Sequence, residues 1–254
     1  MKDLLDLQTL RGACRFLPED HIFFAEECDS TNAAAKEWVT AGNTGSALFV
    51  AAAQTAGRGR MGRSFYSPPG SGVYFTLARA GNAPIPAPVG MTCAAAVAVL
   101  QTISQKCGVQ CEIKWVNDLI YQGKKVCGIL AESVTCGTQT AILTGVGVNL
   151  RPTEFPPELA GTAGSLRDEK TPRAALIAGI AARLLSFLEN PTPEKWLAEY
   201  RRHSCVLGRR VTFSRDGVTT EAVALEIEAD GGLRVQTAAG TEVLRTGEIT
   251  LRLI

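Results

Sequence analysis

The feature that most constrains the fold is a glycine-, arginine- and proline-rich segment at residues 57–72, GRGRMGRSFYSPPGSG. Its start matches G-x-G-x-x-G, a pattern that binds dinucleotides when it opens a helix whose amide groups face a pyrophosphate. Here Pro68 and Pro69 exclude a helix, because proline lacks the amide hydrogen and clashes with the preceding turn. Apolar runs flank the segment at 47–53 and 73–79. The sequence therefore predicts a long loop between two strands, not a Rossmann turn.

Composition limits the classes of partner. The 254 residues are 46% hydrophobic and 20% charged, which suits one large packed domain or one domain with a small satellite. The 26 Lys and Arg residues nearly balance 25 Asp and Glu, leaving a formal charge of +1. No general basic surface is expected to hold DNA by its phosphates. Any anion-binding site must be a local cluster.

Cysteine, histidine and hydropathy patterns exclude further classes. The 8 cysteines form no C-x-x-C pair and lie in apolar runs, so we expect buried thiols in a reducing, cytoplasmic compartment. With only His21 and His203, zinc ligation and a Ser-His-Asp triad are disfavoured. The Met1 end lacks a signal-peptide core. The apolar stretch 89–109 is alanine-rich and interrupted by polar residues, which predicts a buried helix and no membrane span.

Two domains are expected, 1–206 and 207–254. Within the first, the apolar runs at 124–134 and 141–150 are predicted to be antiparallel neighbours. The second contains only short strand-like runs separated by glycine turns, which is typical of a small β-barrel.

Two further clusters accompany the arginine-bearing loop. KWVND at 114–118 ends a predicted strand, and KKVCGIL follows at 124–130. Taken alone, these indicate a turn and a solvated hairpin tip. GVGVN at 145–149 puts two glycines into a strand, which indicates a bulge or a close packing contact. The loop alone shows only a candidate anion site, since its arginines could equally be solvated.

Together, in this order and at these separations, the clusters resemble the signatures of the biotin protein ligases. The resemblance covers nearly the whole chain, with one departure, Val116 in place of the family's proline. The matching segments are Ser-Thr-Asn at 30–32, Gln54, GRGR-x-G at 57–62, Lys-Trp-Val-Asn-Asp at 114–118, Lys-x-x-Gly-Ile-Leu at 125–130, Gly-x-Gly-x-Asn at 145–149 and Gly-Glu-Ile at 247–249.

The resemblance implies an α+β fold: a mixed β-sheet flanked by helices, of the class II aminoacyl-tRNA synthetase and biotin ligase type, and then a small C-terminal SH3-like β-barrel. It also implies ATP-dependent ligation of biotin to a lysine of a biotin carboxyl carrier protein domain through biotinyl-5′-adenylate, with Mg²⁺ on the phosphates. The stretch before Ser30 is too short for the winged-helix domain of members that double as repressors, so no DNA binding is expected. A homodimer is possible.

Site residues follow from the same resemblance. Lys125, Arg58 and Arg60 are the expected catalytic cations, because two anions must be brought together. No protein metal site is expected, apart from a possible magnesium contact near Asp118. The expected biotin-binding residues are Ser30, Thr31, Asn32, Gln54, Arg58, Gly59, Arg60, Lys125 and Gly128. The expected ATP-binding residues are Arg58, Arg60, Arg63, Trp115, Asn117, Asp118 and Asn149.

Two alternatives stay open. A lipoate or octanoate ligase would share the fold and couple a different carboxylate to a carrier lysine. A non-catalytic sensor would bind biotin but release no pyrophosphate. In the ligase hypothesis, residues 57–72 form a lid that orders over the ligands, because an acyl adenylate must be protected from water.

Overall fold

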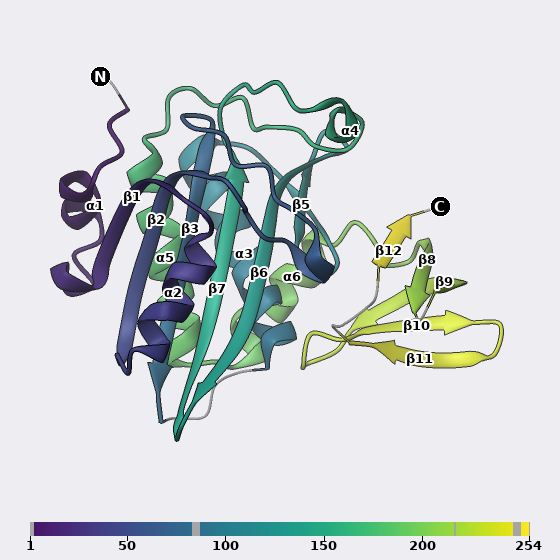
Figure 1. Ribbon diagram of the computed structural model, residues 1–254. Helices are drawn as coiled ribbons and strands as arrows, with labels where there is room; N and C mark the ends of the chain where they lie inside the picture. Colours follow the sequence, from purple (N-terminus) through teal and green to yellow (C-terminus); the bar gives the residue numbers. More distant parts are fainter. Residues whose placement is uncertain (1–2, 83–86, 216, 246–249, 254) are drawn as a thin grey trace.

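The computed structural model describes residues 3–82, 87–215, 217–245 and 250–253 (Figure 1). Its helices, including the short 3-10 helices η1 to η3, are α1 (Leu7–Ala13), η1 (Glu19–His21), α2 (Thr31–Thr40), η2 (Arg60–Gly62), α3 (Pro88–Cys107), α4 (Pro157–Ala160), α5 (Arg173–Glu189), η3 (Pro193–Lys195) and α6 (Leu197–His203). Its strands are β1 (Ile22–Cys28), β2 (Gly45–Gln54), β3 (Gly72–Gly81), β4 (Glu112–Lys114), β5 (Asp118–Tyr121), β6 (Lys124–Cys136), β7 (Gln139–Asn149), β8 (Arg210–Arg215), β9 (Val218–Ile227), β10 (Leu233–Thr237), β11 (Gly240–Leu244) and β12 (Thr250–Leu253).

A seven-stranded sheet forms the centre of the larger part, in the order β1-β2-β3-β7-β6-β5-β4. β1 and β2 are parallel, and the other pairs are antiparallel. Alternate strand residues face α3 and α5 on one side and α2 on the other. The predicted mixed sheet with flanking helices is confirmed, as are the strand–loop–strand context of residues 57–72 and the antiparallel β6–β7 pair.

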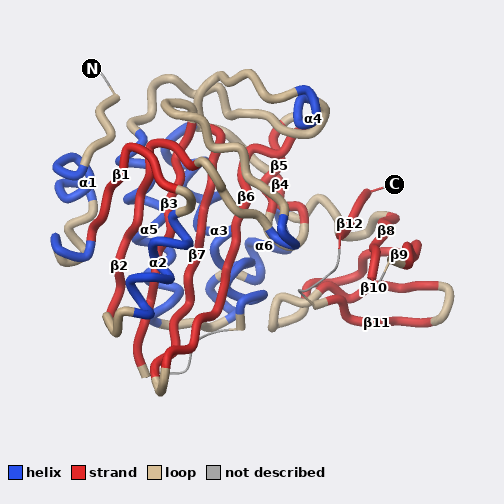
Figure 2. Tube along the Cα trace, in the orientation of Figure 1, coloured by secondary structure: helices blue, strands red, loops and turns tan. Residues whose placement is uncertain are grey.

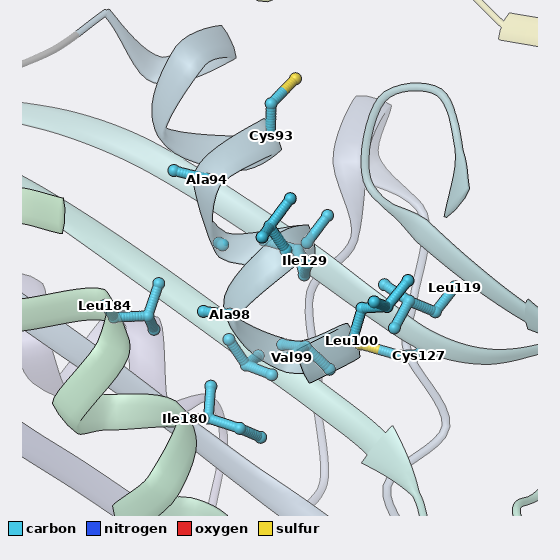
Figure 3. Packing of buried hydrophobic residues seen from close by; sticks show 14 of the residues in the cluster. Cys93, Ala94, Ala98, Val99, Leu100, Leu119, Cys127, Ile129, Ile180 and Leu184 are labelled. Atoms are coloured by element: carbon cyan, nitrogen blue, oxygen red, sulfur yellow. The ribbon is translucent and has the colours of Figure 1, made fainter. Parts of the chain in front are cut away.

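The main core centres on α3. This helix begins at Pro88, one residue before the apolar stretch 89–109 that predicted it, because proline is well tolerated in the first turn. Its buried side chains pack between β5 and β6 on one side and α5 on the other (Figure 3). Burying each large aliphatic side chain stabilises the fold by about 1.5–3 kcal/mol. The predicted buried helix is thus confirmed, and no helix among the described residues is long and apolar enough to cross a membrane.

The candidate site lies on the face of the sheet that packs against α2. In one row across the strands, Gly128 of β6 pairs with Gly147 of β7, which pairs with Tyr74 of β3. In the next row, Leu130 pairs with Gly145, which pairs with Thr76. The glycines make this part of the face shallow, since they project no side chain.

The C-terminal part forms a separate antiparallel sheet in the order β11-β10-β9-β8-β12 (Figure 2). It is consistent with the predicted SH3-like module. Among the described residues this sheet does not close into a barrel, because β11 and β12 lie at its opposite edges. The Gly-Glu-Ile match at 247–249 lies outside the described residues.

The chain passes between the sheets near Cys205. Its amide donates to Ile113 O of β4, whereas the amide of Gly208 donates to Ala224 O of β9. The predicted boundary between residues 206 and 207 lies in this segment and stays a prediction.

α5 begins at Arg173, with Pro172 in the cap position. The predicted burial of all the cysteines needs correction. All eight cysteines are free, but Cys28, Cys107 and Cys136 are only half-buried, because they lie at the ends of their elements. Ser30 occupies the cap position of α2 but makes no side-chain capping bond.

Candidate active site

One pocket of about 1010 Å³ brings together residues from α2, the loop after β2, β6, β7 and the turn between β4 and β5. Ser30 lines it from the cap position of α2, where its side chain makes no capping bond. The predicted site residues that line it are Ser30, Thr31, Asn32, Gln54, Arg58, Gly59, Arg60, Arg63, Trp115, Asn117, Asp118, Lys125 and Gly128.

The floor of the pocket is made by strand glycines. A Cβ at Gly147 would lie 2.4 Å from Cε1 of Phe65, and a Cβ at Gly128 would lie 3.0 Å from Cε2 of the same ring. The Phe65 ring also meets Tyr74 edge-to-face, with centroids 6.4 Å apart. These glycines therefore leave space for a flat group between β6, β7 and the loop. Phe65 fills that space, and sequence analysis missed this residue.

The loop over the floor is an ordered hairpin. Isolated bridges join Gln54 to Ser67 and Arg58 to Ser64, and the Phe65 amide donates to Gly57 O at 2.8 Å. Gly57 is required here, because a Cβ would lie 2.4 Å from Phe65 O. These bonds hold residues 54–67 together as one hairpin.

Cationic groups line the wall next to the floor. Lys125 Nζ lies 2.6 Å from Asp118 Oδ1. This is an ion-pair distance without hydrogen-bond geometry, so Oδ1 is a buried acceptor with no hydrogen-bond donor among the described residues. Arg60 Nη1 donates to Asn117 Oδ1 at 3.3 Å. Burial lowers the pKa of Arg60, while nearby Asp118 opposes the shift, and an arginine stays charged under both influences. Arg58 and Arg63 are more exposed, on the loop.

Hydrogen bonds to residues outside the pocket wall and to β6 fix the turn after β4. Trp115 is buried, and its indole N–H donates to Gly231 O of the C-terminal sheet at 3.0 Å. The Tyr200 hydroxyl of α6 donates to Val116 O at 3.1 Å. Asn117 Nδ2 donates to Ile129 O at 3.0 Å. With valine in place of the family's proline, these contacts hold Asn117 and Asp118 at the pocket wall.

A polar group lies at the other end of the floor. Gln54 Oε1 accepts hydrogen bonds from the backbone amide of Thr31 at 2.9 Å and from its hydroxyl at 3.3 Å. Gln54 Nε2 donates to Ser67 Oγ at 3.0 Å. This end of the pocket therefore offers fixed polar atoms beside an apolar floor, a combination that orients a small ligand.

The sequence matches two family models: the Biotin/lipoate A/B protein ligase family over residues 24–149 and the Biotin protein ligase C terminal domain over residues 206–252. The bifunctional ligase/repressor BirA of Bacillus subtilis is 33% identical over 91% of this chain and 74% of its own length. This chain belongs to the biotin protein ligase family. As a member it is a ligase enzyme, and the family resemblance inferred from its motifs is confirmed.

Other relatives support the assignment. The biotin–[acetyl-CoA-carboxylase] ligase of Paracoccus denitrificans is 30% identical over 87% of this chain and 96% of its own. The fold is that of the biotin protein ligase from Aquifex aeolicus in complex with biotin and ATP, with a TM-score of 0.76. That structure is 24% identical and covers 92% of this chain and 99% of its own.

Asn149 is the predicted site residue of this ligase that does not line the pocket. It is 6% exposed, and its Nδ2 donates to Gly164 O at 2.9 Å, which ties the end of β7 to the loop after α4. Leu159 of α4 and, from the loop after it, Gly161 and Thr162 line the pocket wall. Sequence analysis missed these residues, because nothing in their local pattern indicates a site.

The described residues do not form a magnesium cage. They contain no cluster of three or more His, Cys, Asp or Glu side chains that could hold a metal. Glu112 and Asp118 are the carboxylates among the described pocket residues, and Asp118 already lies against Lys125. A magnesium site made mainly of carboxylates does not fit this wall.

Proposed function

We propose that this ligase attaches biotin to a specific lysine of a biotin carboxyl carrier protein domain, using ATP and a biotinyl-5′-adenylate intermediate. The observation that carries the proposal is that Lys125 and Arg60 line the same pocket as the glycine floor and the Thr31–Gln54 pair. Such a pocket combines a flat apolar surface, polar groups for a ring urea and cations for two anionic substrates.

In the first step, a carboxylate oxygen of biotin attacks the α-phosphorus of ATP. A phosphorus–oxygen bond forms, the bond to the bridging oxygen breaks, and pyrophosphate leaves. Both reactants are anions, so fixed cations must offset their repulsion and the charge of the transition state. Lys125 and Arg60 supply this charge at the pocket wall, with Arg58 and Arg63 adding to it from the loop.

In the second step, the amine of the carrier lysine attacks the acyl carbon of the adenylate. A carbon–nitrogen amide bond forms, the bond from the acyl carbon to the phosphate oxygen breaks, and AMP leaves, while the amine releases its proton. Since an acyl adenylate hydrolyses in water, the loop at 57–72 covers it until the carrier arrives.

Nucleotide binding is proposed for the same wall, beside Lys125 and Arg60. Trp115, Asn117 and Asp118 are rigidly held there and face the pocket. Magnesium that accompanies ATP would offset the charge of the phosphates, and Asp118 would be its proposed contact at this wall. Asn149 stays a proposed ATP contact only if the loop after α4 releases its side chain.

The main alternative is a lipoate or octanoate ligase, since one matching family model covers both activities. The Thr31–Gln54 pair favours biotin, because a linear acyl chain has no urea for these groups to bind. A non-catalytic biotin sensor is the other alternative, and Lys125 and Arg60 in the same pocket favour chemistry over sensing.

The decisive experiment is ATP–pyrophosphate exchange with biotin, lipoate and octanoate in parallel. Exchange that depends on biotin supports the proposal, and exchange with lipoate or octanoate alone overturns it. Biotin binding without exchange would identify a sensor. Transfer to a purified carrier domain, read as a mass increase on one lysine, then tests the second step.

A further inference from the structure

The carboxylate of Glu132 lies behind the pocket, at the end of a chain of polar side chains. Asn32, at the start of α2, is 4% exposed and donates from Nδ2 to Glu132 Oε2 at 2.6 Å. Glu132 does not line the pocket, whereas Asn32 does. A charged group therefore acts on the pocket wall through one intervening amide.

The fold makes room for this amide. A Cβ at Gly145 would lie 2.3 Å from Asn32 Oδ1, so Asn32 reaches the sheet only because β7 has a glycine at that position. The hydroxyl of Thr76, which is fully buried, donates to the same Oδ1 at 2.5 Å. Both polar atoms of Asn32 are thus engaged by the protein, which suits a residue that organises the wall.

Glu132 determines which way the amide faces. An ionised carboxylate only accepts hydrogen bonds, so the NH₂ of Asn32 must face Glu132 and its oxygen must face Thr76. The Thr76 hydroxyl has one hydrogen and two acceptors in reach, Asn32 Oδ1 at 2.5 Å and Thr31 Oγ1 at 2.8 Å. A fixed Oδ1 attracts this hydrogen. If the Asn32 amide flipped, the Thr76 hydroxyl would instead donate to Thr31 Oγ1 and occupy one of the lone pairs of that oxygen.

We propose that Glu132 is a positioning residue of the biotin site: by fixing the Asn32 amide, it keeps a lone pair of Thr31 Oγ1 available to accept from a ring-urea N–H of the ligand. This inference rests on the proposed function. Thr31 lines the pocket, and its own hydrogen has Gln54 Oε1 in reach, so its oxygen is the group left for the ligand.

The test is Glu132→Gln, which keeps the shape but offers a donor, so that the Asn32 amide can flip. The dissociation constant of biotin, measured by calorimetry, should rise about tenfold, the cost of one hydrogen bond to the ligand. The KM for biotin should rise with it, while the KM for ATP, kcat and the melting temperature stay unchanged. The matched control is Glu37→Gln, which removes an exposed carboxylate from α2 without touching Asn32.

Exchanging the amide of Asn32 and the carboxylate of Glu132 should restore biotin binding. Asn32→Asp alone places two carboxylates in contact and should weaken biotin binding far more than Glu132→Gln. In the double variant Asn32→Asp with Glu132→Gln, the glutamine donates to the aspartate, which still accepts from Thr76, so binding should recover most of the loss.

Different results would refute the proposed function and the positioning role of Glu132. A wild-type chain that does not bind biotin would refute the proposed function itself. If the wild type binds biotin but Glu132→Gln binds it equally well, or the swap restores nothing, the positioning role is wrong. An equal change in the KM for ATP, or a lower melting temperature, would show a general structural role and overturn the inference.

Discussion

The ring of Phe65 lies on Gly147: a Cβ there would come within 2.4 Å of the ring atom Cε1. The residues are far apart in the chain, and the contact seats the loop at 57–72 on the floor formed by β6 and β7. The proposed biotin site uses the same floor. Biotin binding on this floor would therefore require the Phe65 ring to move.

Gly147→Ala should dislodge this ring. A buried clash normally costs about 1–3 kcal/mol, but Phe65 belongs to a loop that can lift, so we expect a smaller loss of unfolding free energy and a more open loop. Trypsin should then cut faster at Arg58, Arg60 and Arg63. Limited proteolysis and urea unfolding measure the two effects. Gly81→Ala is the control, because a Cβ there has open space. Unchanged cleavage of the Gly147 variant would contradict the seating of the loop.

Ligands should have the opposite effect on the same loop. If the hairpin closes over biotin and ATP, its backbone becomes less accessible to trypsin. Cleavage within residues 57–72 should slow when both ligands are present, and less so with either alone. Mass spectrometry of the fragments identifies the sites. Equal cleavage with and without ligands would argue against a lid.

Lys125→Ala should abolish adenylate formation without unfolding the chain. The side chain lies beside Asp118 at the pocket wall, and loss of a fixed charge at a developing anion costs at least about 100-fold in rate. Biotin-dependent ATP–pyrophosphate exchange measures this loss. Lys124→Ala is the matched control: its Nζ donates to Ala160 O and Gly161 O, so it holds the loop after α4 rather than the substrates. Normal exchange in the Lys125 variant would remove that residue from the mechanism.

Local signals were sufficient for much of the fold. The prolines after GRGRMG predicted the strand–loop–strand context, and the apolar runs predicted α3, β6 and β7, because these signals depend on neighbouring residues. The pocket also contains nearly all motif residues. What the sequence could not predict depends on contacts between distant segments. Examples are Phe65 on Gly147, and Asn32 on Glu132 at a separation of 100 residues.

For Asn149 the sequence predicted a contact with ATP, whereas in the fold its side chain bonds another part of the chain. Its motif places it at the end of a strand that lines the pocket, but its amide is used by Gly164. The course of the chain after α4 decides this contact, and the local pattern around Asn149 contains no information about that loop.

Acid should weaken the turn that precedes α5, in which the Asp168 carboxylate accepts hydrogen bonds. Burial tends to raise the pKa of Asp168, but hydrogen bonds from Thr171 and from the Lys170 amide outweigh it and lower the pKa from 3.8 to about 2. A carboxyl whose pKa is lowered in the folded state stabilises the fold at pH values above its unfolded pKa, and this stabilisation is lost as pH falls through the folded pKa.

Asp168→Asn should therefore cost roughly 1 kcal/mol of unfolding free energy at neutral pH, since the group is partly exposed. The difference from wild type in urea unfolding should shrink between pH 3.8 and about 2. A difference independent of pH would show that the charge is not responsible.

The C-terminal sheet should stabilise the turn of the nucleotide wall through one backbone carbonyl. Gly231 has φ +89°, and a Cβ there would lie 3.1 Å from Cys93 Sγ and 3.2 Å from Gly90 Cα, so the turn fits against α3 only as glycine. Its carbonyl accepts from the Trp115 indole at 3.0 Å.

Gly231→Ala combines backbone strain with a steric clash, so we expect a loss of about 1–3 kcal/mol in unfolding free energy. Trp115→Phe removes only the hydrogen bond and part of the ring, so it should cost less in stability than Gly231→Ala, yet raise the KM for ATP. Gly217→Ala, also at positive φ but with open space around it, separates backbone strain from the contact. If Gly217→Ala and Gly231→Ala destabilise the chain equally, the contact between the two sheets contributes nothing measurable.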